Sequence, residues 1–211
     1  MKERPFFIAI HGVDGTGKTK TADTTASQLL DMGIKAINYD RYERDLVNPH
    51  SVDRARILLE ESPSSQLAHY LKSTMFHSDN IQELLRKGYS VVKSRYVDDV
   101  LAHHAHLGVE NVAEMEHLFP IVQPDLRVIL TLDEVMRRER LNRRGAFDNR
   151  DREEKVVGSR LDFFEKYLLQ KNADLIRIGK AIRIDTGELN PQQVARRIID
   201  FLLNIRGEDC E

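Results

Sequence analysis

Residues whose types and spacing are suited to chemistry lie together near the start of the chain, in the run GVDGTGKT at residues 12–19. The spacing fits the pattern G-x-x-x-x-G-K-[ST], a loop whose backbone N–H groups wrap a phosphate chain. In such a loop we expect Lys18 to reach the β- and γ-phosphates of a nucleotide and the Thr19 hydroxyl to bind Mg²⁺. The expected nucleotide contacts are Gly12, Asp14, Gly15, Thr16, Gly17, Lys18 and Thr19.

The segments on either side of this loop support the same interpretation. Residues 6–10 are all apolar, as in a strand that is buried on both faces. Behind the loop, apolar residues recur at helical spacing until Gly33, namely Ala22, Ala26, Leu29 and Leu30. A helix that begins directly after the loop points its positive end at the phosphates. The alternative, a glycine-rich turn without a ligand, leaves this order of strand, loop and helix unexplained.

Arginine and tyrosine follow the next two predicted strands. The run NYDRYERD at residues 38–45 contains Arg41, and VVKSRY at residues 91–96 ends in Arg95 and Tyr96. Guanidinium groups bind phosphate oxygens in bidentate fashion, so two arginines that converge from adjacent strands suit an anionic acceptor. Solvated surface charge is the alternative for both runs.

The chain alternates between strand and helix patterns along its whole length. Strands are predicted at residues 6–10, 35–39, 89–93, 126–132 and 181–184. The clearest helix follows Asn190, an expected N-cap, and Pro191 at the first helical position. This alternation predicts an α/β fold of the P-loop NTPase class, with a five-stranded parallel sheet flanked by helices on both faces. Ligands of such sheets bind at the carboxyl ends of the strands.

Composition limits the classes of partner. The 211 residues include 41% hydrophobic residues and suit a single domain over residues 1–211. A net charge of -2, from 32 basic and 34 acidic residues, argues against general binding to nucleic acid or to membranes. The single Cys210 excludes an internal disulfide, and no run is long enough to span a membrane. We expect a soluble cytoplasmic protein.

Several motifs in order resemble those of the thymidylate kinase family of P-loop nucleoside monophosphate kinases. The likeness covers nearly the whole chain. GVDGTGKT is similar to the phosphate loop of the family, and YDRY at residues 39–42 stands where members have Phe-Pro-Arg-Tyr. The segment at residues 84–104 resembles the one that carries Asp-Arg-Tyr, and QPDLRVILTLD at residues 123–133 resembles the strand with Pro-Asp-Leu and Leu-Asp. RRGAFDNRDREE at residues 143–154 resembles the lid.

The resemblance implies phosphoryl transfer from ATP, with Mg²⁺, to a nucleoside monophosphate such as dTMP or a related pyrimidine nucleotide. It implies catalytic roles for Lys18, Asp14 and Arg95, and we expect Thr19 and Asp14 to hold the Mg²⁺. The acceptor contacts that it suggests are Tyr39, Arg41, Tyr70, Thr74, Arg95, Tyr96, Asp99 and His103. A homodimer is also expected from the family, through helices near residues 65–87 and 96–107.

Arginines gather around the predicted lid. Seven of them surround Gly145: Arg137, Arg138, Arg140, Arg143, Arg144, Arg150 and Arg152. A cationic segment that closes over the transferring group excludes water and offsets the negative charge of the transition state. Some members carry an arginine at the position of Gly15, so we expect Arg144 and Arg150 of the lid to supply that cation here.

Two departures from the family leave alternatives open. Ser94 replaces the aspartate of Asp-Arg-Tyr, which removes a carboxylate that helps to hold magnesium, and Asp14, Asp98 or Asp99 are possible substitutes. Helix capping is the other explanation for the last two. In the base pocket, Thr74 stands in place of an arginine and cannot reach the base as an arginine would.

Two other functions fit the same scaffold. Asp40 follows the second predicted strand and could act as the base that deprotonates a hydroxyl acceptor, as in a nucleoside or other small-molecule kinase. A regulatory protein that binds nucleotide without turnover is the third possibility, because Ser94 lacks the carboxylate of the family.

Overall fold

The computed structural model describes residues 4–46, 62–143 and 154–208. One parallel sheet runs through it, in the order β2-β3-β1-β4-β5. Its strands are β1 (Phe7–Gly12), β2 (Ala36–Asn38), β3 (Ser90–Ser94), β4 (Leu126–Thr131) and β5 (Ala181–Asp185). All five predicted strands are confirmed, each shifted by no more than two residues at either end.

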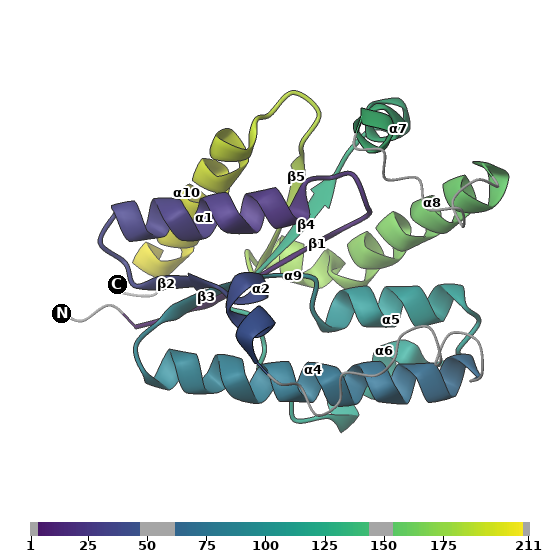
Figure 1. Ribbon diagram of the computed structural model, residues 1–211, viewed down its shortest axis with the longest axis horizontal. Helices are drawn as coiled ribbons and strands as arrows, with labels where there is room; N and C mark the ends of the chain where they lie inside the picture. Colours follow the sequence, from purple (N-terminus) through teal and green to yellow (C-terminus); the bar gives the residue numbers. More distant parts are fainter. Residues whose placement is uncertain (1–3, 47–61, 144–153, 209–211) are drawn as a thin grey trace.

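Helices cover both faces of this sheet, as predicted (Figure 1). In Figure 1, α1 and α10 lie on one face, and α4 and α5 lie on the other. The longer helices are α1 (Lys18–Asp31), α4 (Pro63–Arg86), α5 (Val97–His106), α7 (Glu134–Arg143), α8 (Glu154–Lys171) and α10 (Pro191–Glu208). The shorter turns are α2 (Tyr39–Tyr42), η1 (Glu43–Asp45), α6 (Val112–Met115), η2 (Glu116–Leu118) and α9 (Ala173–Arg177).

The central strand β1 is buried on both faces, and its side chains alternate between two cores. Ile8 and Ile10 pack into the cluster that holds the apolar faces of α1 and α10. Phe7 and Ala9 pack into the cluster formed with α4 and α5. Successive side chains of a strand point to opposite faces, so a strand between two helical layers must be apolar at every position. This explains the continuous apolar run before the phosphate loop.

The cap of α10 agrees with the prediction from sequence. The Asn190 side chain accepts a hydrogen bond from the backbone N–H of Gln193 at 2.9 Å, and the Gln193 side chain accepts one from the N–H of Asn190. This reciprocal pair satisfies N–H groups that a helix start otherwise leaves without partners. The apolar stripe of α10 then packs against α1 and β1, because Val194, Ile198 and Leu202 are all buried there.

The register of the sheet decides what gathers at its carboxyl edge. Ile10 of β1 lies beside Ser94 of β3, and Gly12 lies beside Leu130 of β4. Asn38, the last residue of β2, lies beside Val92. The phosphate loop and the segments that follow β2 and β3 therefore emerge next to one another, where ligands of parallel sheets bind.

Candidate active site

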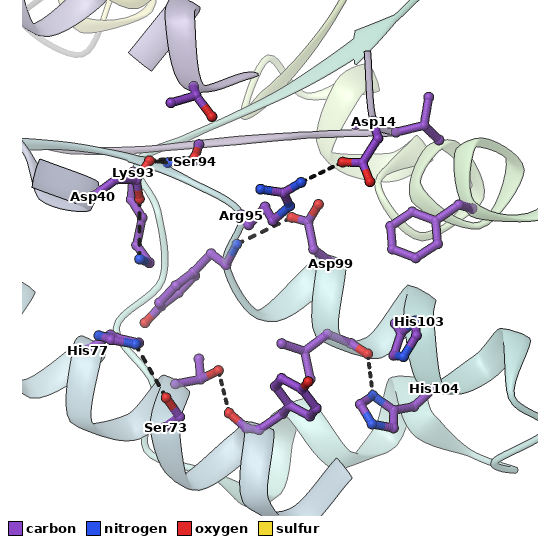
Figure 2. A pocket seen from close by; sticks show the side chains of 18 of the residues that line it. Asp14, Asp40, Ser73, His77, Lys93, Ser94, Arg95, Asp99, His103 and His104 are labelled. Carbon is purple, nitrogen blue, oxygen red and sulfur yellow. Dashed lines mark hydrogen bonds and ion pairs between the residues drawn. The ribbon is translucent and has the colours of Figure 1, made fainter. Parts of the chain in front are cut away.

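A cavity of about 800 Å³ opens at this edge of the sheet (Figure 2). Its walls come from the phosphate loop, the turns after β2, the end of β3, and the helices α4, α5 and α8. Nine of the residues expected at the site line it: Gly12, Asp14, Thr19, Tyr70, Thr74, Arg95, Tyr96, Asp99 and His103. The structure thus brings together most of the residues that we selected from sequence.

Lys18 is buried inside the phosphate loop. Its ammonium group donates to the backbone carbonyls of Gly12 at 2.6 Å and Val13 at 2.8 Å, and it lies 3.4 Å from the Asp14 carboxylate. Burial, together with the positive charge of Arg95, lowers the pKa of Lys18 to about 8. A phosphate group near this amine would favour its charged form and raise that pKa again.

Gly15 is in contact with an arginine of α7. Its φ of +91° lies in the left-handed region, and a Cβ atom built there would lie 2.7 Å from the Cγ atom of Arg137. Arg137 is only 3% exposed, and its Nε atom has no hydrogen-bond partner within the part of the chain that the structure describes. Close packing by Arg137 therefore requires a glycine at position 15.

Arg95 forms an ion pair with the phosphate loop. Its guanidinium group lies 2.5 Å from Oδ1 of Asp14, and the side chain remains half exposed to the cavity. Burial by itself would raise the pKa of Asp14, but the charges of Lys18 and Arg95 outweigh it and hold that pKa below its usual value. Arg95 has a φ of +59°, which is uncommon outside glycine and typical of functional sites.

A second group of charges lines the cavity beside the ends of β2 and β3. Asp40 accepts hydrogen bonds from both the backbone N–H, at 3.0 Å, and the hydroxyl of Ser94. Lys93 lies 2.8 Å from Glu43 and 3.4 Å from Asp40. His77, on α4, lies 3.4 Å from Glu43. Of these four side chains, only Asp40 was considered from the sequence, as a base.

Two expected acceptor contacts lie outside the cavity. The Arg41 side chain is 65% exposed and pairs with Asp23 of α1 at 2.6 Å, facing a separate, smaller hollow. Arg41 and Arg95 therefore do not converge in this structure, because Asp23 holds Arg41 on the outer surface. Tyr39 is fully buried behind the cavity wall, where its hydroxyl lies 3.2 Å from Nδ1 of His77 and Lys93 lies over its ring.

Two of the three aspartates considered as substitute metal ligands lie on α5, in different environments. Asp98 is fully buried and pairs with Arg127 at 3.3 Å and Lys171 at 3.3 Å, away from the cavity. Burial alone would raise its pKa, but the cationic groups around it keep that pKa low. Asp99 lines the cavity and accepts from His11 at 2.5 Å and from the N–H of Tyr96 at 3.3 Å. The capping explanation thus holds for Asp99, and Asp98 serves a buried ion cluster.

The far end of the cavity is aromatic and weakly polar. Tyr70 and Thr74 come from α4, and the Thr74 hydroxyl donates to the Tyr70 carbonyl at 2.8 Å. The rings of Tyr70 and His104 lie 5.4 Å apart. His103 and His104 both line the cavity, and His104 is otherwise buried, with its Nδ1 atom 2.7 Å from the carbonyl of Val100. Among the residues that the structure describes, no group of three or more His, Cys, Asp or Glu side chains is arranged to hold a metal.

The arginines near the predicted lid lie in different environments. Arg138 and Arg143 form exposed ion pairs with glutamates one turn earlier on α7. Arg140 donates to the carbonyls of Thr186 and Gly187 after β5, at 2.7 and 3.3 Å. Arg144, Arg150 and Arg152 lie outside the described residues.

The fold and the phosphate loop together define a class of protein. A parallel sheet in this order, with a glycine-rich loop between its central strand and α1 and a buried lysine at the start of α1, is the arrangement of P-loop nucleotide-binding proteins. A sequence model of the family described as thymidylate kinase matches residues 10–198. The chain belongs to the thymidylate kinase family, a family of ATP-dependent nucleoside monophosphate kinases.

Individual relatives support this assignment over nearly the full length of the chain. A probable thymidylate kinase of Archaeoglobus fulgidus is 27% identical over 203 residues, which cover 94% of this chain and 97% of the relative. A thymidylate kinase of Leptospira borgpetersenii is 24% identical, with 95% of each chain covered. The solved thymidylate kinase of Candida albicans has the same fold, with a TM-score of 0.62 at 20% identity, covering 96% of this chain and 93% of that one.

Most of the residues that sequence reasoning missed carried a detectable signal. Lys93 is a charged residue inside an apolar strand, and His11 is a polar residue at the end of another. His77 is three residues after Thr74 and seven after Tyr70, so helical spacing puts all three on one face of α4. Leu161 and Phe164 of α8 also line the cavity, and no local pattern indicated this.

Packing of Arg137 against Gly15 predicts a specific loss of stability. Gly15→Ala introduces both an unfavourable positive φ and a clash, whereas Gly33→Ala introduces only the φ, because nothing lies within 4 Å of its added Cβ. We expect Gly33→Ala to lower the free energy of unfolding by about 1–2 kcal/mol, and Gly15→Ala to lower it by about 1–3 kcal/mol more. Urea unfolding measures both.

A second variant identifies the clash as the cause. Arg137→Ala in the Gly15→Ala background removes the atom that the new methyl group meets, so the double variant should regain part of the lost stability. Equal losses for the Gly15 and Gly33 variants, or no recovery in the double variant, would show that Arg137 does not restrict position 15.

His77 predicts a loss of stability in mild acid. Burial, followed by the charge of Lys93, lowers its pKa from 6.5 to about 4. Between these two values the unfolded chain binds a proton that the folded chain does not, so stability falls as the pH falls from 6.5 towards 4. The His77 share of this fall is about 3 kcal/mol. In urea unfolding across this range, His77→Gln should show a shallower dependence on pH, and an unchanged slope would contradict the assignment.

Proposed function

We propose that this chain transfers the γ-phosphoryl group of ATP to a pyrimidine nucleoside monophosphate, dTMP or a related nucleotide, with Mg²⁺. The observation that carries the proposal is the Arg95–Asp14 pair, in which a half-exposed arginine faces the phosphate loop across one cavity. An arginine in this position can bind the phosphate of an acceptor while the loop binds the phosphates of the donor.

The donor side consists of the phosphate loop. Backbone N–H groups of residues 12–19 surround the phosphates, and Lys18 exchanges the carbonyls of Gly12 and Val13 for phosphate oxygens. The Thr19 hydroxyl and the Asp14 carboxylate are hard oxygen ligands, which suit Mg²⁺. Bound there, the ion would neutralise charge that develops on the transferring group.

The acceptor side consists of Arg95 and the aromatic end of the cavity. Arg95 places the acceptor phosphate, which already carries a nucleophilic oxyanion, so that catalysis requires positioning and no general base. Tyr70 offers a face on which a base can stack. Because the Thr74 hydroxyl donates to the Tyr70 carbonyl, it contributes less hydrogen bonding to the base than an arginine would. We infer a pocket selective for pyrimidines through shape, with Asp99 and His103 near the sugar.

Location and assembly remain predictions. Among residues 4–46, 62–143 and 154–208, none of the helices combines the length and the apolar character needed to span a bilayer. A cytoplasmic location and a homodimer are expected from the family.

An acceptor panel tests the proposed function. The purified protein is incubated with ATP and Mg²⁺ against nucleoside monophosphates and free nucleosides, and both ADP release and product mass are followed. We expect diphosphates from dTMP or a related pyrimidine monophosphate. Turnover of nucleosides alone would refute the proposal and favour a hydroxyl acceptor.

Arg95→Met tests the acceptor site directly. We expect kcat/KM for the monophosphate to fall by about 100-fold or more, because the variant removes a cation that binds charge on the acceptor. The matched control is Arg177→Met, which removes an exposed arginine of α9 that pairs only with Asp174 in the described structure. Equal activity of the Arg95 variant and the control would contradict the role of Arg95.

A further inference from the structure

Four carboxylates line the cavity, and a basic side chain lies near each of them. Asp14 is bound by Arg95 at 2.5 Å. Glu43 is bound by Lys93 at 2.8 Å. Asp99 lies 2.5 Å from Nδ1 of His11. These three contacts are all 2.8 Å or shorter.

Asp40 is held differently. Its Oδ2 atom accepts hydrogen bonds from two neutral donors of one residue, the backbone N–H and the hydroxyl of Ser94. The nearest cation is Lys93, which is 3.4 Å from Asp40 and closer, at 2.8 Å, to Glu43. Neutral donors fix the position of a carboxylate without cancelling its charge. Asp40 therefore has a fixed orientation and, among these four carboxylates, the greatest distance to its nearest basic nitrogen, at 3.4 Å.

The position of this pair is suited to a metal ion at the phosphates. Asp40 follows the end of β2 and Ser94 ends β3, and Ser94 lies beside Ile10 just before the phosphate loop. The Thr19 hydroxyl lines the same cavity. Figure 2 shows the Asp40–Ser94 and Arg95–Asp14 contacts on one side of the cavity, opposite His77 and His104.

We propose that Asp40, oriented by Ser94, binds a water ligand of the magnesium ion and so supplies from β2 the carboxylate that Ser94 cannot supply from β3. The proposal rests on the proposed function, and it makes Asp40 a positioning residue. Mg²⁺ keeps several of its waters and is commonly held through carboxylates. The Ser94 hydroxyl then orients the carboxylate, and the departure of this chain at position 94 is compensated by Asp40.

The test measures magnesium affinity without turnover. A fluorescent N-methylanthraniloyl derivative of ADP is bound to the full chain, and Mg²⁺ is titrated. Asp40→Asn keeps the shape of the side chain and removes its charge. We expect about 10-fold to 100-fold more Mg²⁺ for half-saturation, as for other groups that hold a metal through its ligands. Binding of the nucleotide without Mg²⁺ should not weaken, because no attractive contact to phosphate is removed.

Two variants separate this role from a general effect of charge. Glu43→Gln removes a carboxylate from the same Lys93 cluster without contacting Ser94, and should leave the magnesium requirement within about twofold of the wild type. The exchange Asp40→Ser with Ser94→Asp moves the carboxylate to β3 and should restore magnesium affinity relative to Asp40→Ser alone. An equal shift for Glu43→Gln, or no recovery in the exchange variant, would overturn the proposal.

The magnesium titration can be interpreted whichever acceptor the protein uses. An unchanged magnesium requirement in Asp40→Asn overturns the proposal, and if phosphorylation of a hydroxyl acceptor is lost at the same time, Asp40 is a base instead. If the wild-type protein phosphorylates no monophosphate, but Asp40→Asn still needs more Mg²⁺ than the wild type, only the proposed function is refuted. The magnesium titration therefore tests the role of Asp40, and the acceptor panel separately tests the proposed function.

Discussion

Parallel pairing of β1 on both of its edges is the constraint on which the site depends. β1 is bound by β3 on one side and by β4 on the other, and its side chains are buried in both cores. The phosphate loop can leave the sheet at only one point, directly beside the end of β3. Because the register is set by apolar packing over the whole strand, a shift would disrupt both cores together.

Charge balance within the cavity follows from this geometry. Three strand ends place aspartates and basic side chains within a few ångströms of one another, so nearly every charge finds an opposite partner. The positive φ of Arg95 fits this arrangement, since it is an uncommon backbone conformation located where the arginine must face Asp14. Asp40 differs from the other cavity carboxylates, because the neutral donors of Ser94 orient it and its nearest basic nitrogen, that of Lys93, is farther away, at 3.4 Å.

Much of the fold could be predicted from sequence because it depends on local signals. The apolar run at residues 6–10, the glycine pattern and the Asn190 cap each specify an element, and alternation specifies a parallel sheet. Side-chain partners between distant segments could not be predicted in this way. Arg41 pairs with Asp23 and Asp40 pairs with Ser94, and neither choice is encoded by spacing along the chain. Position relative to a strand end predicted which residues are near the cavity, but not which way they point.

The central claim is that one cavity holds donor and acceptor phosphates together, between the phosphate loop and Arg95. The most direct measurement is calorimetric binding of a compound in which adenosine and thymidine are joined by a pentaphosphate chain. The account predicts one molecule bound per chain, displaced by ATP and, independently, by thymidylate. Displacement by ATP alone would contradict it, because the acceptor half of the compound would then lie outside the cavity.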